Sequence, residues 1–179
     1  AFDKATQTDD PSLKIRARAG KVRTALRVAE YSLAQSEAEV LKAEAPRDAE
    51  AIALYGDALW SAGLFDESEA VFEQALALNP ESSRARFGRA RALTSVNKLD
   101  AALTEAQAAL VNAPRDGEIY AQIGTIYERL HRFAEAANAY TSFINLLPNK
   151  DRSDKAQWTR AQVKFLQAFE GRVPVDIDS

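Results

Sequence analysis

The chain of 179 residues contains no cysteine, no methionine and only one histidine. Without cysteine it can form no disulfide and offers no thiolate as a nucleophile or metal ligand. A single histidine excludes metal sites that are built from several imidazoles. The isolated glycines do not form a phosphate-binding loop. These absences predict a chain with no catalytic residues, no cofactor and no metal.

Long apolar runs and a large excess of one charge are also missing. No apolar run approaches the length of a membrane span, and the formal net charge is −3, so we expect no membrane span and no nucleic-acid partner. The apolar content of 46% predicts a soluble, folded protein, and the sequence leaves its compartment open between cytoplasm and periplasm. The chain begins with Ala1 and shows no charged-then-apolar leader, so we expect either a trimmed piece of a longer chain or a processed product, and both leave room for a targeting segment that has been removed.

Proline recurs at a constant interval in this sequence. The four equally spaced prolines are Pro46, Pro80, Pro114 and Pro148. Two residues after each of the first three prolines comes a side chain that can cap the start of a helix. These side chains are Asp48, Ser82 and Asp116. The interval predicts a repeating unit in which each proline separates one helix from the next.

The middle of each interval predicts a tight turn. The residues at this place, which tolerate a positive φ, are Gly63, Asn97 and His131. We therefore interpret His131 as a turn residue and not as a proton donor or ligand. An apolar residue follows two positions later, and we expect Asp66 and Asp100 to cap the second helix just after it. Each unit is thus predicted to be a helix, a turn and a second helix.

Apolar and small residues recur at helical spacing within the units. The small residues at one phase of the first helix, where another helix can approach closely, are Gly56, Ala90 and Gly124. Together with the closing prolines, this pattern resembles the tetratricopeptide repeat in its bacterial form. The resemblance implies an all-α fold, a right-handed α-solenoid of stacked antiparallel helix pairs with a C-terminal capping helix. It also implies a noncatalytic interaction scaffold whose first helices line a concave groove for a peptide or helix of a partner.

The repeat divides the chain into segments. We expect three tetratricopeptide-like repeats in residues 49–150, which are 49–82, 83–116 and 117–150. The other expected segments are a polar tail at 1–11, a capping helix at 151–171 and an extended tail or linker at 172–179. Residues 12–48 leave two alternatives open, a degenerate repeat or one long helix. No glycine, proline or asparagine forces a break between Lys21 and Ala45.

Two segments depart from the repeat pattern. The repeat at 83–116 has Arg86 and Arg89 at phases that are usually apolar and Ala106 at a phase that is usually aromatic, so we expect it to pack thinly. A helix over 154–170 is predicted to cover the end of the array. Its residues expected to face inward are Trp158, Phe165, Leu166 and Phe169. Those expected to face outward are Arg160, Lys164 and Glu170.

The resemblance assigns one face of the first helices to the groove. The residues on that face that we predict to bind a partner are Asp57, Trp60, Arg84, Phe87, Arg91, Gln122, Thr125 and Arg129. Trp60 and Phe87 are large aromatics that the internal packing does not require, and aromatics beside arginines are common in binding hot spots. The alternative is that they cover a neighbouring helix or are hidden by the tail. Arg84 and Arg91 can together hold one acidic side chain or phosphate of an extended ligand.

A run near the N-terminus is basic and contains no acidic residue. Its members are Lys14, Arg16, Arg18, Lys21, Arg23 and Arg27. Such a run on a helix invites a nucleic-acid or membrane-surface interpretation. The simpler account, which we favour, is a basic face beside the acid-rich stretch from Glu30 to Glu50, where unlike charges set the helix register.

The sequence therefore predicts an adaptor that binds a protein or peptide whose identity the chain does not reveal. One alternative is that the chain is the regulatory or targeting half of a larger bacterial enzyme. Residues 147–158 resemble the end of repeat regions that precede aspartic-protease-like domains, and catalysis would then lie outside this chain. Self-association is a third hypothesis, because exposed array ends are often covered by another copy.

Overall fold

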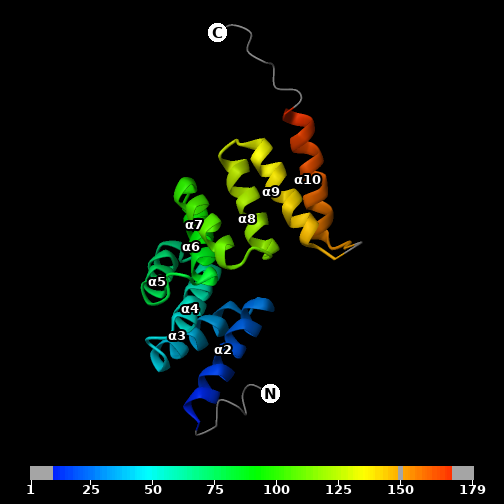
Figure 1. Cartoon of the computed structure of the whole chain (residues 1–179). Coiled ribbons are helices and arrows are strands. Elements are labelled where there is room, and N and C mark those ends of the chain that lie inside the picture. The colour runs from blue at the N-terminus through cyan, green and yellow to red at the C-terminus, as the bar shows by residue number, and fades with distance from the viewer. Residues whose placement is uncertain (1–9, 149–150, 171–179) are drawn as a thin grey trace. The chain divides into compact units, whose positions relative to one another are not determined.

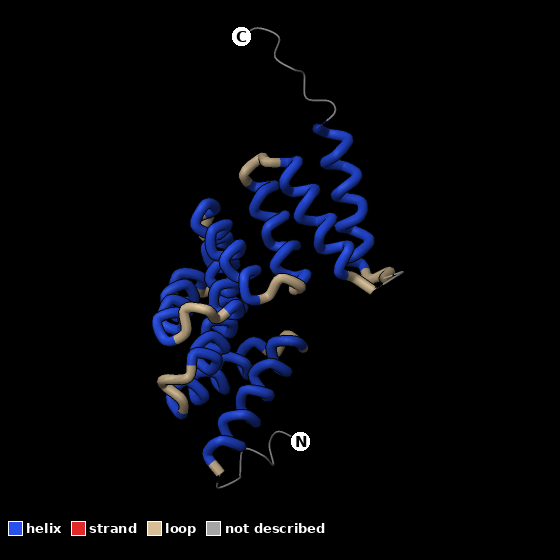
Figure 2. Tube along the Cα trace, in the orientation of Figure 1, coloured by secondary structure: helices blue, strands red, loops and turns tan. Residues whose placement is uncertain are grey.

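The structure, a computed structural model, describes residues 10–148 and 151–170. These residues contain nine α-helices and no strand (Figures 1 and 2). The helices are α2 (Pro11–Arg27), α3 (Tyr31–Glu44), α4 (Ala49–Ser61), α5 (Phe65–Leu78), α6 (Ser83–Ser95), α7 (Leu99–Asn112), α8 (Gly117–Arg129), α9 (Phe133–Leu146) and α10 (Asp154–Glu170). The all-α repeat fold predicted from the proline interval is confirmed. Most of the expected tails at 1–11 and 172–179 lies outside the described residues.

The chain forms two compact units, residues 1–112 and residues 113–179. The sequence predicted a single array, and the division falls in the loop between the repeats at 83–116 and 117–150. The N-terminal unit contains α2 to α7, and the C-terminal unit contains α8 to α10. The repeat that we expected to pack thinly is the last one of the N-terminal unit.

Consecutive helices pack against each other within each unit. In the N-terminal unit α4 also packs against both α2 and α6. The first helices of the three pairs therefore form one layer, which we call the first-helix layer, and α3, α5 and α7 pack against this layer. In the C-terminal unit α8 packs against α9, and α9 packs against α10. The apolar side chains that meet between the helices make the core of each unit.

The predicted caps of the first helices are confirmed. The carboxylates of Asp48 and Asp116 accept from the amides of Glu50 and Glu118 at 2.9 and 3.0 Å, and the Ser82 hydroxyl accepts from the amide of Ala85. The predicted caps of the second helices are wrong. Helix α5 already begins at Phe65 and α7 at Leu99, so Asp66 and Asp100 lie inside the first turn. There their negative charges still interact favourably with the positive end of the helix dipole.

The turns inside the pairs repeat with the same interval as the prolines. The residues with positive φ at these turns are Ala29 (61°), Gly63 (81°), Asn97 (63°) and His131 (59°). Ala29 ends α2, so residues 12–48 form a helix pair and not one long helix. An alanine pays a steric penalty in this conformation, which is why the sequence left the break open.

We expect the substitution Ala29→Gly to stabilise the N-terminal unit by about 0.5–1 kcal/mol. Glycine removes the steric strain of an alanine in the left-handed conformation, which is roughly 1–2 kcal/mol, and this gain exceeds the entropy cost of glycine. Ala43→Gly, at an exposed position inside α3, is the matched control and should lower the free energy of unfolding by about 0.5–1 kcal/mol. Urea unfolding followed by circular dichroism measures both values. A lower midpoint for the Ala29 variant would contradict the turn.

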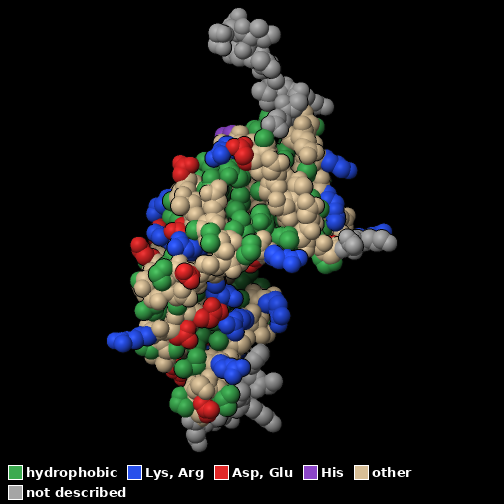
Figure 3. All heavy atoms as spheres, viewed as in Figure 1, with side chains coloured by type: hydrophobic (Ala, Val, Ile, Leu, Met, Phe, Trp, Pro, Cys, Tyr) green, Lys and Arg blue, Asp and Glu red, His purple; other side chains and the backbone are tan. Residues whose placement is uncertain are grey.

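Three members of the basic run on α2 pair with carboxylates of α3. The ion pairs that join α2 to α3 are Lys14–Glu44, Arg18–Glu44, Arg18–Glu37 and Lys21–Glu37. Figure 3 shows basic and acidic side chains next to each other on the N-terminal unit. Burial raises the pKa of Glu37, but the hydrogen bonds and charges of Lys21 and Arg18 outweigh it, so this pKa lies below its ordinary value. This agrees with the simpler account of the run.

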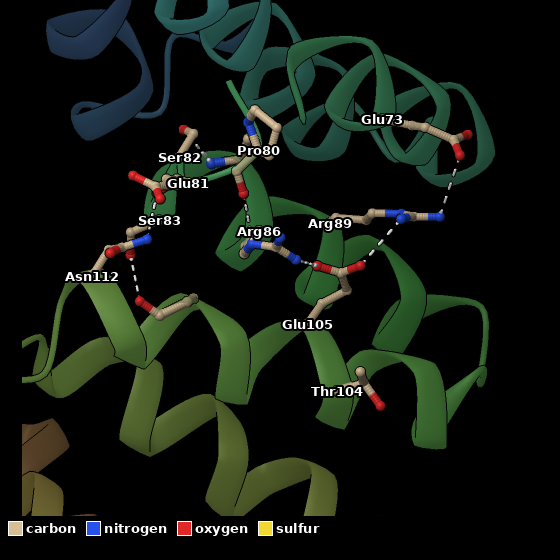
Figure 4. A network of polar contacts seen from close by, with 12 residues as sticks. Glu73, Pro80, Glu81, Ser82, Ser83, Arg86, Arg89, Thr104, Glu105 and Asn112 are labelled. Atoms are coloured by element: carbon tan, nitrogen blue, oxygen red, sulfur yellow. Dashed lines mark hydrogen bonds and ion pairs between the residues drawn. The ribbon is translucent and has the colours of Figure 1, made fainter. Parts of the chain in front are cut away.

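The middle repeat uses the same device in place of apolar packing. Arg86 and Arg89 of α6 donate to the two oxygens of Glu105 of α7 at 3.0 and 3.1 Å (Figure 4). Glu105 stands two repeats after Glu37, which Arg18 and Lys21 hold in the same way. The two arginines and Glu105 are largely shielded from solvent. The repeat at 83–116 is therefore held by charge where the pattern usually has apolar side chains.

Glu105→Gln should lower the free energy of unfolding of the N-terminal unit by about 1–3 kcal/mol. The change leaves Arg86 and Arg89 with a neutral partner in a poorly solvated place. Glu73→Gln is the control, because Glu73 reaches Arg89 only at 3.8 Å and its side chain is 69% exposed; its effect should stay within about 0.5 kcal/mol. Equal midpoints for the two variants in chemical unfolding would show that Glu105 does not hold the pair.

The final helix is present, but the predicted direction of its aromatics is wrong. Leu166 is buried as expected, whereas Trp158, Phe165 and Phe169 are 54%, 61% and 44% exposed. The first helices α4, α6 and α8 begin at equal intervals, but α10 begins three positions later than that interval predicts. The three additional residues change the phase of the helix, so that Leu166 and Val163 pack against the apolar side chains of α9 while the aromatics stay largely exposed.

Candidate partner-binding site

One aromatic ring holds α4 and α6 at the distance that builds the site. Phe72 of α5 lies against Gly56 of α4 and Gly88 of α6. A Cβ atom added to Gly56 would stand 2.8 Å from the Phe72 ring, and one added to Gly88 would stand 2.2 Å from it. Because neither residue has a Cβ, one ring packs against both helices. Helices α4 and α6 therefore lie side by side in the first-helix layer.

Five of the predicted partner-binding residues come together on this pair of helices. Arg91 of α6 lies over two aromatic rings, with its guanidinium carbon 4.4 Å from the centre of Trp60 and 5.2 Å from the centre of Phe87. Trp60, Phe87 and Arg91 are all partly exposed. The Trp60 indole donates to the Ser95 hydroxyl at 3.2 Å, which fixes the ring. Cation–π contacts of this kind hold the three side chains as one rigid surface.

The acidic group between the two arginines belongs to the chain itself. Asp57 of α4 is 7% exposed and accepts from Arg84 at 2.9 Å and from Arg91. Burial raises the pKa of Asp57 above its ordinary value, and the charges of Arg91 and Arg84 oppose this rise. The carboxylate thus anchors Arg91 between the rings, a role that we did not predict for it.

A second ion pair extends the cluster across the first-helix layer. Glu50 of α4 accepts from Arg23 of α2 at 2.9 Å and pairs with Arg84 of α6 at 3.0 Å. These three side chains are 40–47% exposed. With Asp57 and Arg91 included, three guanidiniums face two carboxylates, so the cluster keeps one positive charge. We name the set Trp60, Phe87, Arg91, Arg84 and Asp57 the α4–α6 cluster.

The other predicted site residues lie on α8, in the C-terminal unit. Thr125 shares a hydrogen bond of 3.2 Å with the hydroxyl of Tyr140. Burial and the hydrogen bond to Glu128 raise the pKa of Tyr140 well above its ordinary value. Gln122 is partly buried and Arg129 is exposed. Glu50 and Arg23 lie on the face that the resemblance assigns to the groove, whereas we did not predict Ser95, which accepts from the Trp60 indole.

The side chains of the α4–α6 cluster are of kinds that contact ligands by ring stacking and by charge. Its members are aromatic rings, guanidiniums and a carboxylate that is already paired. Within the described residues, no three acidic or histidine side chains are grouped to hold a metal. The same residues include no helix that is long and apolar enough to cross a membrane. His131 packs edge-on against Phe133 at its turn.

The sequence matches the family model of the tetratricopeptide repeat over residues 14–73 and 55–118. These ranges cover more than half of the chain, so the protein belongs to the tetratricopeptide repeat family. Among curated proteins, it is 31% identical over 96 residues to the Hsp70-Hsp90 organizing protein of Triticum aestivum. The match includes 54% of this chain but spans only 16% of the length of that relative.

Solved structures of other repeat proteins share the fold. TTC0263, a thermophilic tetratricopeptide repeat protein of Thermus thermophilus, superimposes with a TM-score of 0.76 at 18% identity over 93% of this chain and 87% of that one. A MamA AMB-1 structure gives 0.68 at 20% identity over 87% and 88%. The Yersinia enterocolitica secretion chaperone SycD, in complex with a peptide of the translocator YopD, gives 0.63 at 14% identity over 68% and 93%.

Arg91→Ala should lower the free energy of unfolding by about 2–3 kcal/mol at neutral pH, because it leaves buried Asp57 with one guanidinium fewer. The loss should grow as pH rises. Since the folded pKa of Asp57 is raised, protonation at low pH removes the unpaired charge, and the folded form loses this benefit as the group ionises.

Chemical unfolding at several pH values measures this loss, with Arg47→Ala in an exposed loop as the control. The control should change the free energy by no more than about 0.5 kcal/mol. An Arg91 variant as stable as the control across the range would show that Asp57 does not depend on this arginine.

Proposed function

We propose that this chain is a noncatalytic scaffold that binds a segment of a partner polypeptide at the α4–α6 cluster. The observation that carries the proposal is Arg91, which lies partly exposed between Trp60 and Phe87 and is anchored from below by Asp57. Tryptophan and arginine are the residues that most often dominate binding energy at interfaces. Because the contacts within the cluster already order these side chains, a ligand loses less free energy in immobilising them.

The charge of the cluster favours a ligand segment with a carboxylate. Arg84 is 40% exposed and Arg23 is 47% exposed, while Asp57 between the arginines is buried. An incoming carboxylate can therefore reach guanidinium groups without meeting Asp57 directly. The rings of Trp60 and Phe87 offer apolar contact beside these charges. The ligand we propose carries an acidic side chain next to an apolar or aromatic one.

Two comparisons support a binding function. SycD, which shares the fold, binds a peptide of YopD, and family membership places this chain among repeat proteins that act by presenting surfaces. The role as a noncatalytic scaffold agrees with the chemistry of the cluster.

Peptides selected from a random phage-displayed library on the intact protein test this function. Those that bind at the α4–α6 cluster should lose at least about tenfold in affinity on Phe87→Ala and on Arg84→Gln, since these changes remove a ring and an exposed guanidinium. Fluorescence anisotropy measures the affinities, and thermal unfolding establishes that each variant is folded. Arg115→Gln, at an exposed residue in the loop before α8, is the matched control and should bind as the unchanged protein does. Selected peptides that bind all three variants equally would overturn the proposal.

A further inference from the structure

The C-terminal helix α10 has the register of another first helix. Its start is capped by Ser153, whose hydroxyl accepts from the amide of Ala156 at 3.2 Å, as Ser82 does for Ala85 at the start of α6. Ala156 is fully buried, as are Ala85 of α6 and Ile119 of α8. Lys155 pairs with Glu118 of α8 at the place where Arg84 of α6 pairs with Glu50 of α4. Helix α10 therefore aligns with α8 from the first residue of each helix.

This register identifies the face to which the exposed aromatics belong. On α4, the residues Ala53, Asp57 and Trp60 face the next first helix, since Ala53 packs with Ala85 and the other two contact Arg91. Helix α10 is the third first helix after α4. On it, the counterparts of these residues are Trp158, Gln162 and Phe165. Trp158 and Phe165 are 54% and 61% exposed, and Phe169 continues the same stripe at 44%. We name these three rings the α10 stripe.

Rings of α9 contact the α10 stripe and fix two of its members. Trp158 meets Tyr140 edge-on at 5.8 Å, and Phe169 meets Phe133 in the same way at 5.1 Å. Gln162 donates to the Glu128 carboxylate, which also accepts from Tyr140. The rings therefore stand on an ordered base and present more apolar surface than scattered single residues do.

Charge indicates what lies on this face. Neighbouring first helices in one unit differ in sign, because α2 and α6 contain no acidic residue and α4 between them contains no basic one. In the C-terminal unit, Glu118 of α8 pairs with Lys155 of α10 in the same sense. Helix α10 carries Lys155, Arg160 and Lys164, and its two acidic residues, Asp154 and Glu170, stand at its two ends. A second copy of α10 that crosses it near the middle would bring Arg160 and Lys164 of both copies together, whereas an acidic helix would complement them.

We propose that the α10 stripe binds an amphipathic helix of a partner polypeptide, with apolar residues that cover Trp158 and Phe165 and with acidic residues on its flank. The bound helix packs on α10 as α6 packs on α4, but with the charges exchanged, because here the partner helix is acidic and α10 is basic. The proposal extends the scaffold function to a second surface, separate from the α4–α6 cluster, and it stands whether or not that cluster binds a ligand.

The chain's own acidic first helix provides a defined probe. A hydrocarbon-stapled, fluorescein-labelled peptide with the sequence of residues 48–61 contains Asp48, Glu50 and Asp57 and no basic residue. The staple is needed because an isolated helix of this length is marginal in water. The control peptide has the sequence of residues 82–95, which contains four arginines and no acidic residue.

We expect saturable binding of the acidic peptide to the full chain and at least tenfold weaker binding of the basic one. The double variant Trp158→Ser, Phe165→Ser should weaken the acidic peptide at least tenfold, and Lys164→Glu should weaken it to a lesser degree. Val111→Ser removes an apolar side chain that is 78% exposed on α7 and should leave affinity unchanged. Thermal unfolding of each variant establishes that it is folded.

Three results would overturn the proposal. The first is no saturable binding of the acidic peptide, and the second is binding that survives the double variant. The third is a dimer in sedimentation velocity that the double variant dissociates, because the occupant would then be a second copy. Phe87→Ala separates the two surfaces, since it should weaken ligands of the α4–α6 cluster and leave this peptide's affinity unchanged.

Discussion

The seating of Phe72 against two glycines is the contact on which the arrangement of the N-terminal site depends. A single ring on α5 meets Gly56 of α4 and Gly88 of α6, so both first helices approach the same side chain without a Cβ in between. That closeness lets Asp57 reach arginines on the next helix and places Arg91 over Trp60. Tyr140 lies against Gly124 in the C-terminal unit in the same way, with an added Cβ 2.5 Å from the ring. An aromatic ring packed against a glycine, which has no side chain, sets the distance between the helices. This distance lets the charged side chains of neighbouring helices reach one another.

Ion pairs replace apolar contacts between helices where the repeat pattern lacks apolar residues. In the pairs α2–α3 and α6–α7, a glutamate on the second helix is held by two basic residues of the first, Glu37 in one pair and Glu105 in the other. At the position midway between these two glutamates in the sequence, the repeat at 49–82 has the buried Val71. The family fold therefore accepts either an ion pair or a methyl group at this position. An ion pair adds a geometric requirement, because its partners must meet in one register.

The C-terminal helix shows how a small change of phase alters a surface. Three additional residues before α10 leave its cap and its packing against α9 in place. The same change leaves two aromatics largely exposed, on the face of α10 that corresponds in register to the α4 face packed against α6. A helix that the sequence pattern assigns to covering the array therefore presents a surface of its own.

The even spacing of four prolines was sufficient to predict the repeat. Local chemistry then predicted the caps at Asp48, Ser82 and Asp116 and the turns at Gly63, Asn97 and His131, because each cap or turn depends on one residue and its neighbours. The repeat interval places Ala29 at a turn position as well, but the sequence left this break open, since alanine gives no local signal for a left-handed turn. Only the tertiary structure decided that Asp57 fills the space between Arg84 and Arg91, and that Trp158 and Phe165 point outward. Those outcomes depend on the distance between helices and on the direction of each side chain, which changes by about 100° per residue along a helix. The sequence pattern gives the phase of a helix only to within one position, so it determines neither the distance nor the direction.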